Sequence, residues 1–432
     1  MKPKTKLLLI HPSNPKGRTY SSIPPLCLVT LASLTPEKKY DISVADERFE
    51  KIDFSRKYDL VGISANTLTV TRAYELARIF RSKGSKVIIG GVHPSTLPEE
   101  ARKHCDSLVT GEAEEIWQGI LEDFEKGRLR KRYRGGFIDM KNFPRLKSKF
   151  FKKYYIVPVT QATRGCPYGC EFCIVRVFNG GRIRKRPVDD VIADIKSINK
   201  NNRLKMFGFV DDNLFADRKY AIELFRKMKP LGLKWSVQAP VHLAFDDELL
   251  RHAKEAGCKL LWIGFESLNQ ESLKSVKKHN TAKRFEDAIK RFKDAGMLIR
   301  GLFIFGLDGD RKGGLMSTIR FAIKNNLDGI YLHILRPLPG TILFKRLKDE
   351  GRITTYDWSK YEDCVIKPKR MSQKELVDEM HEAYREFYSI RSIIRRMRGI
   401  RSLSNSIIYF YFSIRGWMNT RRGVYTHDYV EG

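Results

Sequence analysis

The segment that decides the fold is Thr163–Cys173 (TRGCPYGCEFC), in which Cys166, Cys170 and Cys173 are spaced as C-x3-C-x2-C. Thiolates are soft ligands that bind zinc or iron–sulfur clusters. A structural zinc ion needs a fourth ligand at a short spacing, but no Cys or His lies between Cys173 and His242. Three thiols on one loop therefore predict an iron–sulfur cluster with one iron left open for a substrate, in preference to three merely buried cysteines.

Apolar runs alternate with helical patterns around and after this loop. The predicted strands are Val157–Thr163, Lys205–Asp211, Lys234–Gln238, Lys259–Phe265, Ile299–Phe305 and Gly329–Leu335. The predicted helices include Val188–Asn199, Ala216–Lys229, Asp246–Ala256 and Ala282–Ala295. A closed eight-fold TIM barrel usually needs about 250 residues, so residues 157–345 predict a partial (βα)6 barrel instead. Its chemistry is expected at the carboxyl ends of the strands.

Residues 1–125 carry a second α/β pattern. The predicted strands are Lys6–His11, Asp41–Asp46, Asp59–Ala65, Lys86–Gly91 and Asp106–Gly111, with helices at Thr71–Ser82 and Glu112–Glu125. Near-continuous apolar runs are typical of parallel strands covered on both faces, which predicts a Rossmann-like, flavodoxin-like sheet. Ligands of such sheets bind beyond the carboxyl ends of the strands. There the chain places small and polar residues that leave room for a large flat ligand: Ser64, Asn66, Thr67, Gly90, Gly91, His93, Gly111 and Glu112.

Length and composition limit the class of protein. A chain of 432 residues, 42% of them hydrophobic, is long enough for two or three domains with large cores. Seven cysteines, three of them within eight residues, do not form a disulfide framework and indicate a reduced, intracellular protein. The N-terminus lacks the apolar region of a signal peptide, and no apolar run reaches the length of a spanning helix. A cytoplasmic protein is expected.

The charge is strongly positive, since 81 Lys and Arg residues face 50 Asp and Glu residues for a net charge of +31. Such an excess indicates an anionic partner, unless it only reflects a basic proteome. Residues 126–153 hold twelve basic residues and one acidic residue, and 126–156 is predicted to be a basic linker. Residues 391–423 hold eight arginines, no acid and a dense aromatic run.

The C-terminal extension, residues 346–432, is predicted to be mainly helical and basic, with one long helix at Gln373–Arg398. Its segment 391–423 suits the anionic inner face of a membrane, with aromatic residues at the interface and arginines on headgroups. The alternative is an amphipathic helix packed on the barrel. No recognisable RNA-binding domain follows the barrel, which argues against a nucleic-acid partner.

The cysteine loop resembles that of the radical SAM superfamily, in which C-x3-C-x-aromatic-C holds a [4Fe–4S] cluster whose open iron chelates S-adenosylmethionine (SAM). The resemblance, with that of the first domain, covers about residues 5–345. It implies SAM contacts at the following positions: Phe172, Asp211, Asp212, Gln238, Glu266, Ile304 and Pro337. Pro240 stands where relatives often carry an arginine, so contacts to the SAM carboxylate must come from elsewhere. Two simpler alternatives are that Asp211 and Asp212 cap the following helix, and that Glu266 is an ordinary loop carboxylate.

The first domain resembles the cobalamin-binding domain of B12-dependent radical SAM enzymes, through Gly90–Pro94 (GGVHP) and Thr110–Glu114 (TGEAE). The resemblance implies that the strand-end residues of this domain named above bind cobalamin. The motif D-x-H-x-x-G, which supplies a cobalt-ligating histidine, is absent. Cobalamin is therefore expected without a histidine below the cobalt, and His93 is expected to contact the corrin or its tail. The remaining cysteines are expected to be buried small hydrophobes: Cys27, Cys105, Cys258 and Cys364.

These features together predict a cobalamin-dependent radical SAM enzyme. The resemblance implies that an electron from a flavodoxin-type or ferredoxin-type donor cleaves SAM, that the resulting radical attacks an unactivated carbon, and that cobalamin donates a methyl group. Ring closure, oxidation, carbon–carbon coupling and RNA modification use similar parts and stay open, as does a non-catalytic B12 or redox sensor. The expected substrate is a small molecule, with a lipid or isoprenoid-like compound preferred because of the basic tail.

Overall fold

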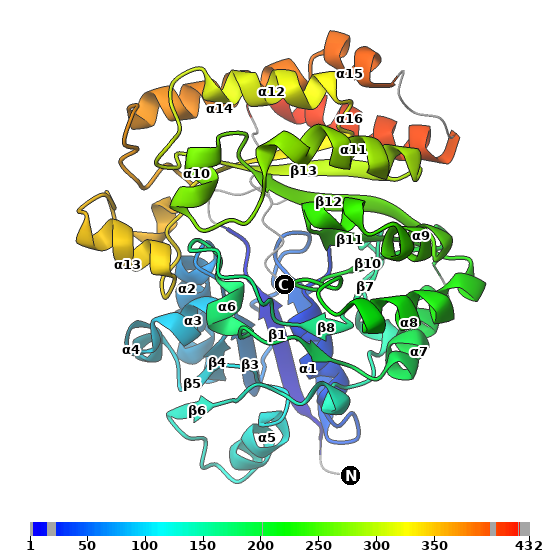
Figure 1. Ribbon diagram of the computed structural model, residues 1–432. Coiled ribbons are helices and arrows are strands. Elements are labelled where there is room, and N and C mark those ends of the chain that lie inside the picture. The colour runs from blue at the N-terminus through cyan, green and yellow to red at the C-terminus, as the bar shows by residue number, and fades with distance from the viewer. Residues whose placement is uncertain (1–2, 15–22, 201, 398–402, 422, 424–432) are drawn as a thin grey trace.

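The structure consists of two parallel α/β units and a set of C-terminal helices. It is a computed structural model, and it describes residues 3–14, 23–200, 202–397, 403–421 and 423. Figure 1 shows the first unit, in blue and cyan, below the second unit in green and yellow, with orange and red helices along the top. The predicted α/β class is confirmed. Parts of the basic tail and C-terminal extension, residues 398–402, 422 and 424–432, lie outside the described residues.

The first sheet is parallel, with strand order β2-β1-β3-β4-β5-β6. Its strands are β1 (Thr5–His11), β2 (Tyr40–Asp46), β3 (Leu60–Ser64), β4 (Lys86–Gly90), β5 (Ser107–Thr110) and β6 (Arg132–Arg134). Its helices are α1 (Leu26–Leu34), α2 (Val70–Ser82), α3 (Val92–Thr96), α4 (Pro98–Ala101) and α5 (Trp117–Glu125). Leu7 and Leu9 of β1 pack in one hydrophobic cluster with α1 and α5, whereas Leu8 and Ile10 pack in another with α2. Burial of both faces explains the continuous apolar runs.

Strand β6 corrects the predicted domain boundary at residue 125. It lies within the segment predicted to be a linker, 126–156, yet it pairs in parallel with β5. Tyr133 at its centre is buried, and its hydroxyl donates to Asp123 of α5. The flanking charges hide this strand in the sequence, because lysine and arginine are also the residues that protect the edge of a sheet from further pairing.

The second sheet is also parallel, with strand order β14-β13-β12-β11-β10-β7. Its strands are β7 (Val159–Thr160), β10 (Met206–Phe209), β11 (Lys234–Ala239), β12 (Cys258–Glu266), β13 (Leu298–Phe305) and β14 (Gly329–Ile334). The helices that connect them include α7 (Val188–Asn199), α8 (Arg218–Met228), α9 (Asp247–Glu255), α10 (Gln270–Ser275), α11 (Phe285–Asp294) and α12 (Gly314–Lys324). This alternation confirms the partial barrel within the described part of the chain.

The first β/α unit of the barrel departs from the regular pattern. Strand β7 is shorter than predicted, because the chain leaves the sheet and forms the antiparallel pair β8 (Thr163–Arg164) and β9 (Arg184–Lys185). The cysteine loop and the short helix α6 (Val175–Phe178) lie between these two strands. The loop is thereby held at the carboxyl end of the barrel, on the side that faces the first domain (Figure 1).

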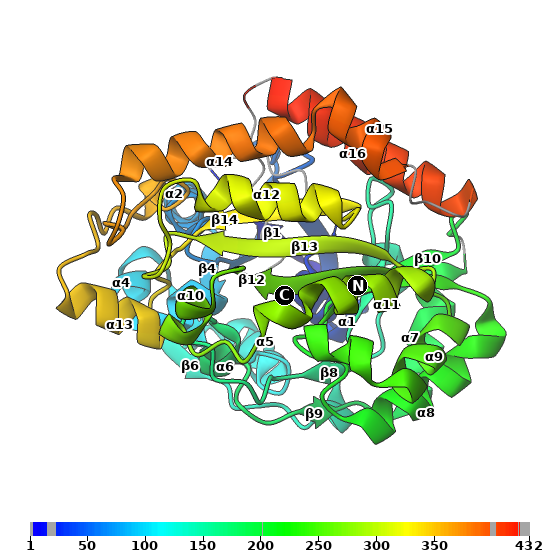
Figure 2. The same ribbon diagram turned by 45° about the horizontal axis from the view of Figure 1, so that its top comes forward.

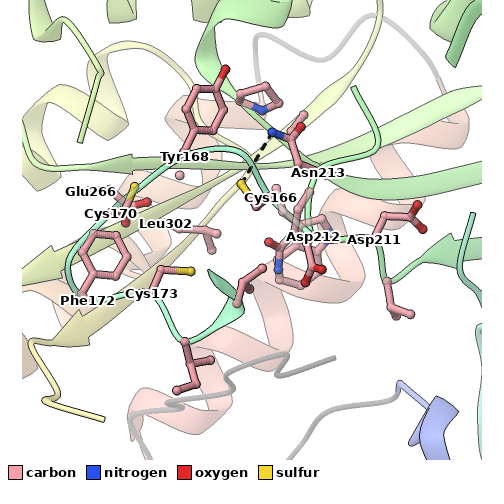
Figure 3. Close-up of a pocket in the computed structure, with 18 of the residues that line it drawn as sticks. Cys166, Tyr168, Cys170, Phe172, Cys173, Asp211, Asp212, Asn213, Glu266 and Leu302 are labelled. Carbon is pink, nitrogen blue, oxygen red and sulfur yellow. Dashed lines mark hydrogen bonds between the residues drawn. The ribbon is translucent and has the colours of Figure 1, made fainter. Parts of the chain in front are cut away.

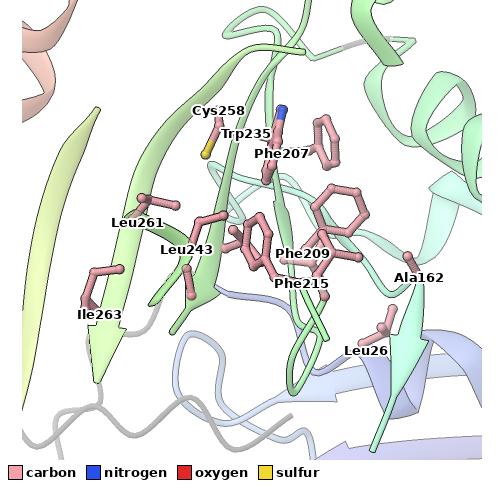
Figure 4. Close-up of a cluster of buried hydrophobic side chains, with 14 of the residues drawn as sticks. Leu26, Ala162, Phe207, Phe209, Phe215, Trp235, Leu243, Cys258, Leu261 and Ile263 are labelled. Carbon is pink, nitrogen blue, oxygen red and sulfur yellow. The ribbon is translucent and has the colours of Figure 1, made fainter. Parts of the chain in front are cut away.

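A hydrophobic cluster joins the two units. Trp235 of β11 packs against Phe209 of β10, edge to face at 5.5 Å, and stacks on Phe225 of α8 at 5.1 Å between ring centroids. Leu26 at the start of α1 belongs to the same cluster, together with Ala162 beside the cysteine loop (Figure 4). The two sheets are therefore fixed relative to each other by shared packing.

The C-terminal helices are α13 (Ile342–Asp349), α14 (Gln373–Phe387), α15 (Ile390–Met397) and α16 (Leu403–Arg421), and the last three lie together in Figure 2. Helices α14 and α16 contact β14 and so cover the open edge of the barrel. The predicted single helix at Gln373–Arg398 is wrong, because the helix ends at Phe387 and a new one, α15, begins at Ile390. The buried Arg396 of α15 donates to the carbonyl of Phe387. The Tyr384 hydroxyl bonds to the backbone of Leu332, which protects edge strand β14.

Helix α16 lies against α14, α15 and β14, so one side of the tail packs on the barrel. Its Ile407 and Phe410 stay exposed, so the packing does not cover the whole helix. Tyr409 is buried there and donates to the carbonyl of Ile393. Among the described helices, none is long and apolar enough to span a bilayer.

Candidate functional site

A cavity of about 370 Å³, which we call the main cavity, lies at the carboxyl ends of the barrel strands and is lined by all three cysteines of the loop. Figure 3 shows Cys166, Cys170 and Cys173 around it, with Phe172 beside them. Burial raises the pKa of Cys166 and Cys170, and that of Cys173 to about 12. The thiols therefore keep their protons until a metal displaces them.

The donor set fits a cluster better than a single ion. Among the described residues, no group of three His, Cys, Asp or Glu side chains converges on one metal ion. The three thiols instead line one wall of a cavity large enough to admit a further ligand. Asn213 adds a polar contact, since its side-chain amide donates to the Cys166 sulfur at 3.9 Å (Figure 3). Its other side-chain atom, Oδ1, is buried without a partner in the described structure.

Asp211 and Asp212 anchor the start of the cysteine loop. The Asp211 carboxylate accepts hydrogen bonds from the backbone of Ala162 and Thr163, and burial raises its pKa to about 7. Asp212 accepts from the backbone N–H of Gly165 at 2.7 Å. Neither residue caps the next helix, because Asp217 caps α8. Both aspartates line the main cavity as predicted, but their carboxylates have partners within the chain.

The other predicted SAM contacts divide between the cavity and its surroundings. Phe172, Gln238, Glu266 and Ile304 line the main cavity, and Gln238 is exposed to it. Pro337 does not line it, although its neighbours Arg336 and Leu338 do. The turn after β14 thus borders the cavity through Arg336 and Leu338, the two neighbours of the predicted Pro337.

Glu266 is held in an unusual conformation. It has a positive φ of 66°, rare for a residue with a side chain, and it follows a bulge in β12. Asn280 donates to the carbonyl of Gly264 and so fixes the bulge. A Cβ at Gly264 would lie 2.5 Å from the Glu266 carboxylate, so a larger residue would displace that group. Strain of this kind is typical of functional sites.

Lys278 lines the main cavity but was not predicted from the sequence. Its ammonium group lies 2.9 Å from Glu266 and faces the cysteines. Burial alone lowers the pKa of Lys278, but the Glu266 carboxylate and the Cys170 thiol outweigh this effect and raise it. No motif marks this lysine, because it follows α10 in a loop whose position depends on the barrel.

A second cavity, of about 130 Å³, lies at the carboxyl ends of β1, β3, β4 and β5. Most of the predicted cobalamin residues line it: Ser64, Gly90, Gly91, Gly111 and Glu112. No histidine is among the described residues of its lining. Glycines at the strand ends leave room in the cavity, and most of the remaining lining is larger apolar side chains such as Leu9, Leu31 and Trp117. Such an edge of a parallel sheet is where ligands bind.

The structure does not bring Asn66, Thr67 and His93 into this cavity. The Asn66 side chain accepts from backbone amides of its own turn. His93 is fully buried, with Nδ1 at 3.2 Å from the Thr67 hydroxyl and Nε2 at 3.4 Å from Glu100. These side chains hold the strand-end loops, and the cobalamin contacts predicted for them stay a prediction.

The cysteines outside the loop differ in their surroundings. Cys105 and Cys258 are buried as predicted, and Cys364 is partly buried. Cys27 corrects the prediction, because it is exposed and lines the second cavity, 3.5 Å from the Ser64 hydroxyl. It stands at the start of α1, next to the open strand ends, and so has no core to enter.

The two cavities share part of their lining. Phe178, Asn179 and Val210 line both of them. Ile23 and Val92 of the first domain reach the main cavity, while Gln161 and Arg164 of the second domain reach the other. The two cavities therefore meet at the interface between the domains.

Two family models match the chain, the radical SAM superfamily over residues 160–322 and the B12 binding domain over residues 18–121. The bacteriochlorophyllide d C-12(1)-methyltransferase of Chlorobaculum tepidum is 32% identical over 417 residues, which are 92% of this chain and 90% of the relative. The C-8(2)-methyltransferase of the same organism is 31% identical, with 86% and 87% covered.

Solved structures show the same fold at low sequence identity. The radical SAM methyltransferase TsrM of Kitasatospora setae, with cobalamin and a [4Fe-4S] cluster bound, has a TM-score of 0.68 and 18% identity. The match covers 80% of this chain and 78% of TsrM. The cobalamin-dependent SAM radical enzyme OxsB has a TM-score of 0.70 and 14% identity, with 97% and 72% covered.

Proposed function

Because the chain belongs to the radical SAM superfamily, in the class with an N-terminal B12-binding domain, we propose that it methylates an unactivated carbon of a large hydrophobic substrate. The predicted family resemblance is confirmed, and the chain is a radical SAM enzyme. Its cofactors are a [4Fe–4S] cluster, SAM and cobalamin. Two relatives named as methyltransferases support methyl transfer over ring closure, oxidation or carbon–carbon coupling.

The observation that carries the proposal is the shared lining of the two cavities, at Phe178, Asn179 and Val210. When bound, the cluster and SAM supply a radical that removes hydrogen from carbon, and cobalamin supplies a methyl group. A substrate carbon near these three residues is within reach of both cavities. The chain's own contribution is to hold the reactive groups in place and to exclude water.

The Glu266–Lys278 pair matches the zwitterionic end of SAM. Cys166, Cys170 and Cys173 would hold the cluster, and Lys278 lines the same cavity close to Cys170 and Cys173. Lys278 binds the SAM carboxylate, and Glu266 binds its amino group. This assignment supplies the cation that Pro240 cannot provide.

The substrate class follows from the lining of the main cavity. Its wall is rich in apolar and aromatic side chains, including Tyr168, Trp262 and Leu302. Three of its charged residues are already paired within the chain: Asp211, Asp212 and Glu266. Such a wall fits a large apolar molecule better than a polar one. A lipid or isoprenoid-like substrate satisfies this condition. A chlorin-type ring is a second candidate, which the names of the two bacteriochlorophyllide methyltransferases favour.

The outer face of α15 and α16 supports contact with an anionic membrane surface. Its exposed apolar side chains are Ile390, Ile394, Met397, Ile407, Phe410, Tyr411, Ile414 and Met418. Arg391, Arg395, Arg415 and Arg421 belong to the same two helices, which contain no acid. The protein binds the bilayer peripherally through this face and draws its substrate from it.

Changing Arg391, Arg395 and Arg415 together to Gln tests the membrane contact. Each arginine near an anionic surface contributes about 1 kcal/mol, so vesicle affinity should fall by about two orders of magnitude. Sedimentation with phosphatidylglycerol vesicles measures this, and binding should weaken as salt rises because screening acts over about 8 Å. Changing Lys345 and Lys348 of α13 to Gln is the control. Equal sedimentation of the triple variant and the wild type would contradict the contact.

An electron donor of flavodoxin or ferredoxin type completes the system. Such donors are acidic, and the outside of the cysteine loop is basic. Arg176 of α6 is exposed there, and Lys277 is largely exposed beside Glu171. These charges support docking of the donor close to the cluster.

Anaerobic reconstitution tests the proposed function. The loaded protein should cleave SAM with dithionite and move a labelled methyl group from SAM into a lipid extract or a chlorin preparation. An RNA extract, assayed in parallel, should stay unlabelled. Label in RNA alone, or SAM cleavage without methylation of any extract, would contradict the proposal.

A further inference from the structure

Glu112, predicted from its motif to bind cobalamin, uses its carboxylate to join the two domains. It follows β5, and its side chain is only 2% exposed. It accepts hydrogen bonds from the backbone N–H of Ile138 at 2.7 Å and from Arg184 at 2.8 Å. Arg164 lies 3.3 Å from the same carboxylate and 2.9 Å from Glu114. Both arginines belong to the radical SAM domain.

The contacts continue from Arg184 to the cysteine loop. Arg184 also donates to the carbonyl of Asn179 at 3.0 Å. The Asn179 side chain donates to Asp212, and Asp212 accepts from the backbone N–H of Gly165. Gly165 stands between Arg164 and the first cluster cysteine, so the contacts form a closed ring that we call the Glu112 ring: Glu112, Arg184, Asn179, Asp212, Gly165 and Arg164.

The Glu112 ring contacts both cavities. Glu112, Arg164 and Asn179 line the second cavity, while Asn179 and Asp212 line the main one. Gly165 permits no side chain, because it has a φ of 98° and a Cβ would lie 2.2 Å from the carbonyl of Arg182. A shift of the strand-end loop at Glu112 therefore has to move the start of the cysteine loop or break a buried ion pair, and breaking such a pair is costly.

We infer that the Glu112 ring couples the occupancy of the cobalamin cavity to that of the cluster site, with Glu112, Arg184 and Asn179 as positioning residues. The inference rests on the proposed function, since it needs both cofactors on one chain. Coupling between two sites is reciprocal, and each ligand changes the affinity of the other by the same factor. A cluster in place should therefore strengthen cobalamin binding by about tenfold, within the usual range of such couplings.

The Glu112→Gln variant tests the coupling, because it keeps the shape of the side chain and removes its charge. Arg184→Lys is a second variant that keeps the charge but cannot bridge Glu112 and Asn179, and Arg182→Lys is the matched control on the exposed surface. Equilibrium dialysis with hydroxocobalamin measures affinity before and after the cluster is removed by chelation. The wild type and the control should show about a tenfold difference. Both ring variants should show less than twofold.

A purely structural role would lower stability without changing this ratio. A persisting tenfold difference in a folded ring variant would overturn the inference, as would a wild type that binds both cofactors independently. The electron spin resonance spectrum of the reduced cluster gives a second readout, and it should change on cobalamin addition in the wild type but not in Arg184→Lys. A wild type that binds neither cofactor would instead overturn the proposed function.

Discussion

The two cavities of this enzyme differ in how they are built. The main cavity presents chemically distinct side chains, with Cys166, Cys170 and Cys173 in its lining and the Glu266–Lys278 pair close to Cys170 (Figure 3). The second cavity presents glycines and apolar side chains at strand ends, and the carboxylates of Glu112 and Glu114 in its lining are paired with arginines. The first site works through the chemistry of its side chains, and the second through its shape. Substitutions should therefore act differently in the two.

The largest effect is expected at the cluster thiols. Cys166→Ala removes one of three ligands, so cluster content should fall to near zero and SAM cleavage should disappear. Iron and sulfide analysis, together with 5′-deoxyadenosine production, measures the loss. Cys364→Ala, which removes a partly buried thiol outside both cavities, should leave both quantities unchanged. A Cys166→Ala protein that still cleaves SAM would show that the site is wrongly assigned.

Cys27 provides the matching test in the second cavity. Cys27→Trp fills the space beside Ser64 and should weaken cobalamin binding by more than tenfold, whereas Cys27→Ala should change it by less than twofold. Equilibrium dialysis with hydroxocobalamin distinguishes these results. If Cys27→Ala weakened binding as much as Cys27→Trp, the thiol itself would be a ligand, and the account of a site built by shape would fail.

The ligands of the cobalt provide a second test of the second cavity. Because no histidine is among the described residues that line the second cavity, the spin resonance spectrum of bound cob(II)alamin should lack nitrogen coupling from a protein histidine. His93→Gln should leave that spectrum unchanged, since His93 is bonded to Thr67 and Glu100. Histidine coupling that His93→Gln abolishes would refute the prediction.

Lys278 should show a smaller effect that is specific to SAM. A hydrogen bond between charged groups contributes roughly 1.5–3 kcal/mol, so Lys278→Gln should weaken SAM binding by about tenfold or more while the cluster stays bound. Lys277→Gln, a change at the exposed neighbour, is the control. SAM affinity measured on the reconstituted protein decides the matter, and equal affinities for both variants would remove Lys278 from the SAM site.

The smallest expected effect is on the pH dependence of folding. The pKa of Asp211 is raised to about 7 in the folded protein by burial, so its contribution to stability is present at low pH and is lost as the pH rises towards 7. His11 acts in the opposite direction, because burial lowers its pKa to about 4 and its contribution is lost as the pH falls through that range. Urea unfolding of the cofactor-free protein at pH 5 and pH 7 measures both.

Asp211→Asn removes a contribution that falls as the pH rises, so between pH 5 and pH 7 its free energy of unfolding should fall less than that of the wild type. His11→Gln removes a contribution that grows as the pH rises, so its free energy of unfolding should rise less than that of the wild type. If the two variants instead followed the pH dependence of the wild type, neither group would titrate as described. The main cavity would then lack the buried carboxylic acid that holds its cysteine loop.

The same contrast explains what the sequence could predict. The cluster loop was predictable because three cysteines at fixed spacing have few other uses, and the strands because both of their faces are buried. Lys278 was not predictable, since it reaches the cavity from a loop whose place depends on packing. Asn66, Thr67 and His93 lie in the expected turns, but the Asn66 side chain bonds within its own turn, and His93 bonds to Thr67 and Glu100. Glu112 lines the second cavity, where its motif predicted it, but its pairing with Arg184 was not predictable, because an ion pair across domains leaves no pattern along the chain.

The measurement that tests the central claim most directly is a single turnover with labelled methylcobalamin. The protein is loaded with its cluster and with methylcobalamin that carries an isotope-labelled methyl group, and is then mixed anaerobically with the lipid or chlorin preparation. Addition of unlabelled SAM and dithionite should move the label into the hydrophobic product, and omission of either should prevent it. Label that stays on cobalamin while SAM is cleaved, or that moves without SAM, would contradict a methyl transfer carried out where the two cavities meet.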